Sequence, residues 1–148
     1  MTQDTLPRGI RNNNPLNIIH SPANPWQGLA TPPSDGHFCR FTSPFYGYRA
    51  AFKLLYRYWH DYRRRTIRGI CYKWAPAGDG NNQPELYAKA VAKNAKFSIT
   101  RNLPALEDDR DLWVRIVLAM TLVENGAKFH EKLWTIYACD AWDALFKD

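Results

Sequence analysis

A single glutamate near the end of an apolar helical segment is well placed for acid catalysis. Glu124 follows the segment Asp111–Val123, and apolar residues precede it at helical spacing: Met120, Val117, Ile116 and Trp113. At about 3.6 residues per turn, these side chains share one face of a helix, the face that packs inward. Apolar surroundings raise the pKa of a carboxyl group, and so does the negative end of a helix dipole.

A carboxylic acid that stays partly protonated near neutral pH is the general acid that glycosidic cleavage requires. Glu124 is therefore a candidate catalytic residue, although from the spacing alone we favour the alternative of a frayed helix end with Glu124 in solvent. Hydrolysis would add a second carboxylate, about 5–5.5 Å away for retention or about 6.5–9.5 Å for inversion. Asp35 is the N-terminal acid that we nominate, although the Asp35-Gly36 step is also good turn chemistry.

Candidate substrate-binding residues come from the first part of the chain. The side chains that could hold sugar hydroxyls, or instead fix a loop beside Glu124, are Asn13, Asn14 and Asn17. Trp26 and Tyr48 are candidates for stacking on sugar rings, with core packing as the alternative for Tyr48. Thr31 is a further candidate, for positioning water.

The composition indicates one basic, aromatic-rich domain. At 148 residues the chain can bury roughly two-thirds of its unfolded surface in a single core. Its six Trp, eight Tyr and seven Phe exceed what a core needs and suggest a groove that stacks on flat ligands. A net charge of +6 favours acidic partners: nucleic acid, anionic lipid or the bacterial wall. The three cysteines are far apart and lack metal-ligand spacing, so we expect no disulfide framework, no metal and no cofactor.

Two other motifs indicate less. The run Arg63-Arg64-Arg65 could bind nucleic acid together with Tyr56 and Tyr58, but positive charges also suit the end of a helix, and we favour that alternative. His130-Glu131 opens no zinc-protease motif, because Trp134 stands where the second histidine is needed. Nucleic acid is therefore not an expected partner.

Periodicity and capping residues predict a mainly α (α+β) fold in one domain, residues 1–148. The Asn- and Pro-rich residues 1–25 are expected to be irregular, and a small β-hairpin is expected within 26–41. Ser43-Pro44 and Thr66 are typical helix starts. The expected helices cover 44–63, 67–74, 84–93, 111–125 and 131–146.

The segment 8–18, RGIRNNNPLNI, resembles a family of phage and prophage virion-associated, lysozyme-like proteins that begin RGIRNNNPxNI. The resemblance continues through Trp26-x-Gly28, Phe38-x-x-Phe41-x-Ser43-Pro44, Gly47-x-Arg49-Ala50, Thr66-Ile67, Trp74-Ala75-Pro76, Asn82, Tyr87 and Glu124-Asn125-Gly126. The chain departs from that pattern in the loop after Pro76, which lacks the usual acid before its Asn pair, and in a longer last helix.

A second likeness concerns flagellar-type glucosaminidases and lytic transglycosylases, in which a Glu-Ser-Gly type motif ends a helix. In the glucosaminidases, segments like Asn13–Ile18, Trp26-x-Gly28 and Phe38-x-x-Phe41 follow that motif, whereas here they precede Glu124-Asn125-Gly126. The rotated order resembles a circular permutation of the lysozyme fold.

These resemblances imply a peptidoglycan glycan-strand cleaving enzyme, either a muramidase or a lytic transglycosylase, with Glu124 as its acid. The alternative is a non-enzymatic virion or wall-binding protein on a lysozyme-like scaffold. The N-terminus has no classical secretion signal, and no segment has transmembrane length. We therefore expect synthesis in the cytoplasm and action in the periplasm or cell wall, after delivery by a phage particle, a lysis system or a secretion machine. Virion or secretion-machine components would then be partners beside the glycan strands.

Overall fold

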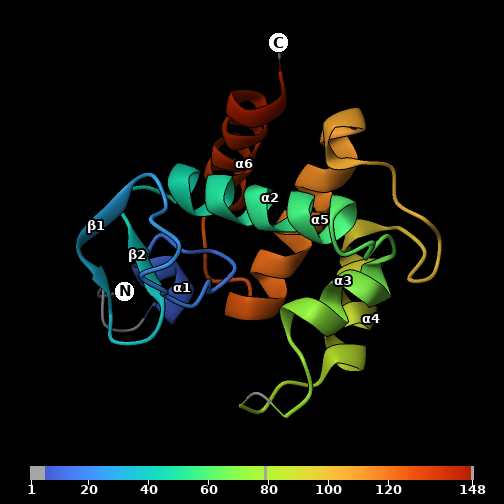
Figure 1. Ribbon diagram of the computed structural model, residues 1–148, viewed down its shortest axis with the longest axis horizontal. Helices are drawn as coiled ribbons and strands as arrows, with labels where there is room; N and C mark the ends of the chain where they lie inside the picture. The colour runs from blue at the N-terminus through green and yellow to red at the C-terminus, as the bar shows by residue number, and fades with distance from the viewer. Residues whose placement is uncertain (1–5, 79, 148) are drawn as a thin grey trace.

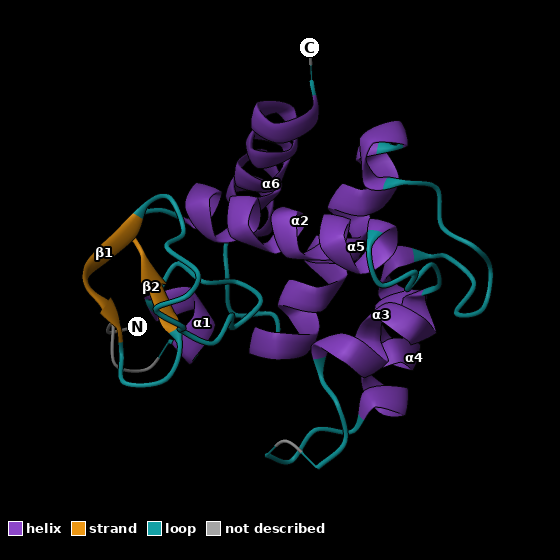
Figure 2. Ribbon diagram, in the orientation of Figure 1, coloured by secondary structure: helices purple, strands orange, loops and turns teal. Residues whose placement is uncertain are grey.

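The computed structural model describes residues 6–78 and 80–147 and is mainly helical, with one small antiparallel sheet (Figures 1 and 2). This confirms the predicted fold class. The elements, in chain order, are α1 (Arg8–Arg11), β1 (Leu29–Ser34), β2 (Cys39–Phe41), α2 (Pro44–His60), α3 (Ile67–Trp74), α4 (Pro84–Ala95), a 3-10 turn (Leu106–Asp108), α5 (Arg110–Asn125) and α6 (Glu131–Phe146).

Helix α5 is the centre of the fold. It contacts α4, α6 and α1, while α2 packs across α6 (Figure 1). The predicted inward face of α5 is buried, with Trp113, Val117 and Met120 fully enclosed. The hairpin and α1 lie on one side of this helical core, and α3 and α4 lie on the other (Figure 1). Helix α1, which begins the N-terminal segment RGIRNNNPLNI, thus contacts α5, which carries Glu124.

The hairpin is joined to the irregular N-terminal segment by backbone hydrogen bonds. Cys39 N–H donates to the Ile18 carbonyl, and Phe41 N–H donates to the Asn12 carbonyl, each at 2.9 Å. Ile19 forms an isolated bridge with Phe38. The N-terminal segment therefore lies against β2 almost as a third strand, which fixes its position relative to the helices.

Predicted helix starts are confirmed at Ser43 and Thr66, whose hydroxyls accept from the N–H groups of Phe45 and Gly69. Helix α2 ends at His60 rather than near residue 63, because Arg63 adopts a left-handed conformation with a φ of 56°. The prediction of a wholly irregular N-terminus was wrong for the one-turn helix α1, which carries no apolar periodicity that could reveal it. In the described part of the chain, no helix has the length and apolar character needed to span a membrane.

Gly47 permits the closest approach between α2 and the N-terminal segment. A Cβ atom there would lie 2.3 Å from the Asn13 carbonyl oxygen and 2.6 Å from Pro15 Cδ. Since backbone cannot move aside as a flexible side chain can, we expect Gly47→Ala to lower the free energy of unfolding by on the order of 1–3 kcal/mol. Chemical denaturation would measure this.

Gly69→Ala is the matched control for this prediction. It is also helical, but its added Cβ would meet the Thr66 side-chain oxygen at 3.2 Å and no backbone closer than 3.8 Å. We expect a clearly smaller effect there. Equal stability changes at the two glycines would contradict the close packing assigned to Gly47.

Candidate active site

Glu124 lies in the last turn of α5 and is held by donors from two other elements. Its Oε1 accepts from Asn17 Nδ2 at 2.9 Å, and its Oε2 accepts from the Tyr87 hydroxyl at 2.8 Å. Asn17 belongs to the N-terminal segment and Tyr87 to α4. The side chain of Glu124 is thus oriented by hydrogen bonds from both sides. The alternative of a frayed helix end with Glu124 in solvent does not apply.

Burial dominates the electrostatics of this carboxyl group. It raises the pKa of Glu124 above its usual value, while the hydrogen bonds from Asn17 and Tyr87 act in the opposite direction. The predicted direction is confirmed, with burial as its cause. Tyr87 is half-buried, and burial raises the pKa of its hydroxyl well above the usual range, so it donates to Glu124 at any physiological pH.

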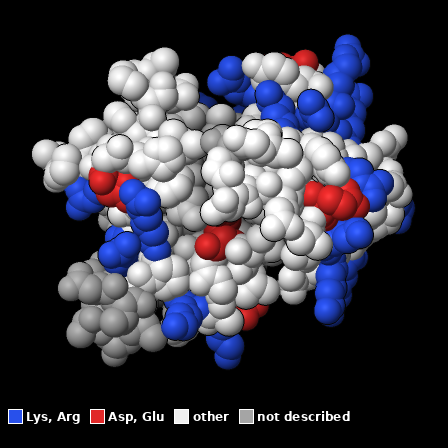
Figure 3. Space-filling model, turned by 90° about the horizontal axis from the view of Figure 1, so that it is seen from below, with Lys and Arg blue, Asp and Glu red and all other residues white. Residues whose placement is uncertain are grey.

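Glu124 nevertheless reaches an open hollow, here called the acid pocket, of about 200 Å³. Its wall comes from the N-terminal segment, the hairpin, the end of α3 and the loop before α4: Asn17, Ile19, His37, Phe38, Trp74, Ala75, Gly80, Asn81, Asn82 and Glu124. The molecule seen from below, the side of the α3–α4 loop, has a centre that is white apart from a small acidic spot, and its charged side chains, mostly Lys and Arg with some acidic ones, lie around the edge (Figure 3). The acid pocket can therefore receive a neutral, hydroxyl-rich ligand next to a buried acid.

The asparagines of the N-terminal segment divide into one that touches Glu124 and two that hold the segment. Asn14 is fully buried, where its amide donates to the carbonyls of Ile18 and Cys39. Asn13 donates to the Phe41 carbonyl at 3.1 Å. Contacts with sugar hydroxyls, predicted for all three, are thus open to Asn17, while Asn13 and Asn14 follow the alternative of fixing the loop.

The segment is fastened directly to the end of α5. Asn125 Nδ2 donates to the Pro15 carbonyl at 2.8 Å, next to the residue that carries the acid. A Cβ at Gly9 would lie 2.5 Å from Asn125 Oδ1 and 2.8 Å from the Asn14 backbone carbonyl oxygen, which cannot move aside, so glycine is required where α1 passes this contact. The Asn17–Glu124 hydrogen bond therefore depends on close backbone packing around it.

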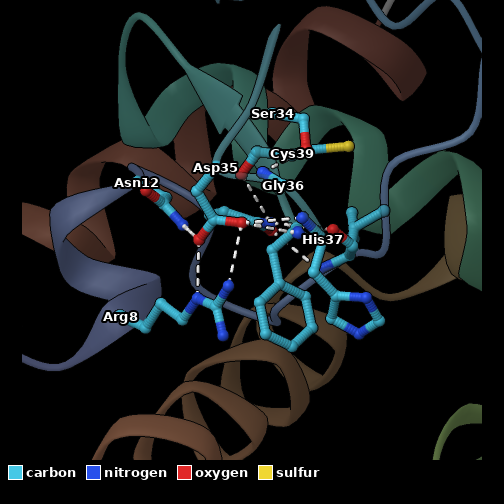
Figure 4. Close-up of polar contacts among 10 residues, drawn as sticks. Arg8, Asn12, Ser34, Asp35, Gly36, His37 and Cys39 are labelled. Carbon is cyan, nitrogen blue, oxygen red and sulfur yellow. Dashed lines mark hydrogen bonds and ion pairs between the residues drawn. The ribbon is translucent and has the colours of Figure 1, made fainter.

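Asp35, the predicted second carboxylate, is engaged elsewhere (Figure 4). Its oxygens bind the Arg8 guanidinium at 2.6 and 3.0 Å, and they accept from Asn12 Nδ2 and from the N–H groups of His37 and Phe38. The hydrogen bond from Arg8 is the main cause that holds the pKa of Asp35 well below its usual range. This geometry corresponds to the turn alternative, and Asp35 does not line the acid pocket.

The three remaining candidates have different positions. Tyr48 is completely buried and hydrogen-bonds Thr121, so it packs in the core and cannot stack on a ligand. Thr31 is exposed on β1 and is not part of the acid pocket. Trp26 lies in a hollow that adjoins the acid pocket, where it shares the wall with Trp74.

The structure adds Tyr87 and Trp74 to the site. Both are among the residues on which the resemblance to the virion-associated proteins rests. That resemblance could have indicated them as site residues, whereas helical spacing could not. Cys71, on α3, lies buried close to Glu124 and Tyr87. Burial, together with the nearby Glu124 charge, raises the pKa of its thiol to about 12, so it remains a neutral, inert neighbour.

Comparison with known proteins shows that this chain is similar to a bacteriophage protein. No family model matches it. Protein P5 of Pseudoalteromonas phage PM2 is 36% identical over 122 residues, which cover 81% of this chain and 72% of the relative's length. The name of that relative says nothing of its activity.

The role of Tyr87 in setting the acidity of Glu124 can be tested directly. Because its hydrogen bond lowers the pKa of a carboxyl group that burial raises, we expect Tyr87→Phe to move the pKa of Glu124 further upward. NMR titration of the ¹³C-labelled glutamate carboxyls would measure it. Tyr72→Phe, which removes a donor to the exposed Glu85 instead, is the control and should leave Glu124 unchanged.

Stability should report the same raised pKa. A carboxyl group whose folded-state pKa is raised stabilises the fold only below its unfolded value, about 4.3, and loses that contribution as pH rises through the folded value. We therefore expect Glu124→Gln to be more stable than the wild-type protein at pH 7, with a smaller difference at pH 4. Thermal denaturation of both proteins, with Glu131→Gln on α6 as control, would measure this, and a difference independent of pH would contradict it.

Proposed function

We propose that this chain, which belongs to the family of protein P5 of Pseudoalteromonas phage PM2, acts on the bacterial cell wall and cleaves the glycan strands of peptidoglycan. The observation that supports this proposal is a partly buried carboxyl group with a raised pKa, held by two donors and lining an open pocket. The sequence resemblance to lysozyme-like virion proteins agrees with this chemistry.

Glu124 is the general acid of the proposed reaction. Each of its oxygens accepts one hydrogen bond from the protein, which leaves capacity for a proton directed at the glycosidic oxygen. When that proton is transferred, the C–O bond breaks and Glu124 becomes a carboxylate. Asn17 and Tyr87 then stabilise the new charge without having to reorient, which is the form of stabilisation that lowers a barrier most effectively.

The second step is proposed to be intramolecular. Among the described residues that line the acid pocket, Glu124 is the one carboxyl group, and Asp35 is bound to Arg8 outside it. A lytic transglycosylase needs a single carboxylate: Glu124 takes the proton of the sugar's own 6-hydroxyl while that oxygen bonds to the oxocarbenium-like carbon. The product then carries an anhydro ring, and Glu124 is again protonated for the next cycle.

Digestion of purified cell wall tests this function. We expect the wild-type protein to release muropeptides with anhydro ends and Glu124→Gln to lose on the order of 10²–10⁴-fold in rate, because an amide cannot supply the proton. Mass analysis of the products separates anhydro from hydrolysed ends. Glu131→Gln, at the exposed start of α6, is the matched control and should retain activity.

Three outcomes would contradict this proposal or parts of it. Full turnover by a folded Glu124→Gln protein would remove Glu124 from the mechanism. Products that all carry hydrolysed ends would replace the intramolecular step with attack by water. Wall binding without any cleavage by the wild-type protein would support the alternative of a non-enzymatic wall-binding protein.

A further inference from the structure

We propose that the binding site continues beyond the acid pocket and ends in a cationic hollow, formed by Lys53 and Arg57, that takes a carboxylate of the peptides attached to the glycan strand. This inference rests on the proposed function and specifies its substrate as peptide-bearing rather than bare glycan. Three observations carry it: the adjacency of the hollows, their exposed apolar and aromatic walls, and the charge at the far end.

The hollows adjoin one another because neighbouring hollows share wall residues. The acid pocket and the next one, here called the aromatic hollow, share Asn17, Ile19 and Trp74. The aromatic hollow, of about 180 Å³, in turn shares Asn24 and Trp26 with the cationic hollow, of about 300 Å³. A ligand seated at Glu124 can therefore extend along the N-terminal segment to α2.

The aromatic hollow has walls suited to the faces of sugar rings. Trp26, Tyr58 and Trp74 line it and are each only partly buried. Trp74 and Tyr58 hold each other edge to face, with ring centroids 5.8 Å apart. Ile19, at the junction with the acid pocket, leaves 49% of its surface exposed. Large apolar side chains that remain open in a groove indicate a ligand that covers them.

The cationic hollow has a charge that neutral sugars do not match. Lys53 and Arg57 stand four residues apart on α2, so they lie on the same helix face, where two like charges repel. Both are exposed, and within the described part of the chain neither forms an ion pair. Asn24, Pro25 and Trp26 complete this hollow, which thus has no acid in its described wall. An anionic ligand group would relieve the repulsion, and the carboxylates of peptidoglycan lie on its peptides.

The test compares glycan strands that carry their peptides with strands stripped of peptides by an amidase, in which the lactyl carboxylates that the amidase leaves on muramic acid are then capped as methylamides. We expect the wild-type protein to have a lower KM for the peptide-bearing strands. In the double variant Lys53→Ala/Arg57→Ala that preference should disappear through a rise in KM of about tenfold, with kcat on these strands retained, because the lost contacts bind a remote part of the substrate. The control Lys128→Ala/Lys132→Ala removes the same charge at exposed positions outside the three hollows and should keep the preference.

The outcomes separate this inference from the proposed function. Equal KM values of the wild-type protein for both substrates, or a preference that survives in Lys53→Ala/Arg57→Ala, would overturn the peptide-binding role and leave glycan cleavage standing. Cleavage of neither substrate would overturn the proposed function itself. Salt-dependent retention of single-stranded DNA that is lost in Lys53→Ala/Arg57→Ala, with no change toward glycan, would assign the hollow to nucleic acid and would also overturn the inference.

Discussion

The site depends on one contact, the packing of the N-terminal segment against the end of α5. Asn125 fastens that segment through the Pro15 carbonyl, and Asn17 from the same segment reaches Glu124. Since the last carbonyls of a helix have no partners within the helix, its end is a natural place for a loop to attach. The same loop also carries the Asn17 amide that orients Glu124, so the attachment of the loop and the proposed chemistry lie in the same turn of α5.

Glycines make this contact possible, and they explain much of the sequence motif. Gly9 passes the Asn125 side chain, Gly47 passes the Asn13 carbonyl, and a Cβ at Gly28 would lie 2.1 Å from the Tyr46 ring. Each stands in a segment that carries the family resemblance. These glycines of the pattern therefore serve close packing, whereas Asn17, Trp74 and Tyr87 reach the hollows or the acid itself.

Local signals predicted the helices well, and distant pairings limited the prediction of the site. The face of α5 and the caps at Ser43 and Thr66 depend on residues a few positions apart, which a sequence displays. The partners of Glu124 come from 107 and 37 residues away, and nothing in the spacing of Tyr87 indicates that it meets an acid. The same applies to Asp35, because its contact with Arg8, 27 residues away, is not visible in the Asp-Gly step.

Glu124 and Asp35, the two carboxyl groups nominated for the proposed reaction, have different surroundings, and this difference supports Glu124 as its proton donor. Arg8, Asn12 and two backbone N–H groups surround Asp35, so it stays ionised and its lone pairs are taken. Glu124 has two neutral donors and no cation within ion-pair distance in the described structure, and burial favours its protonated form. A proton donor must carry its proton before the reaction and tolerate its loss afterwards. Neutral donors meet both conditions, because they stabilise a carboxylate without forcing it to form, whereas a guanidinium such as Arg8 would meet only the second.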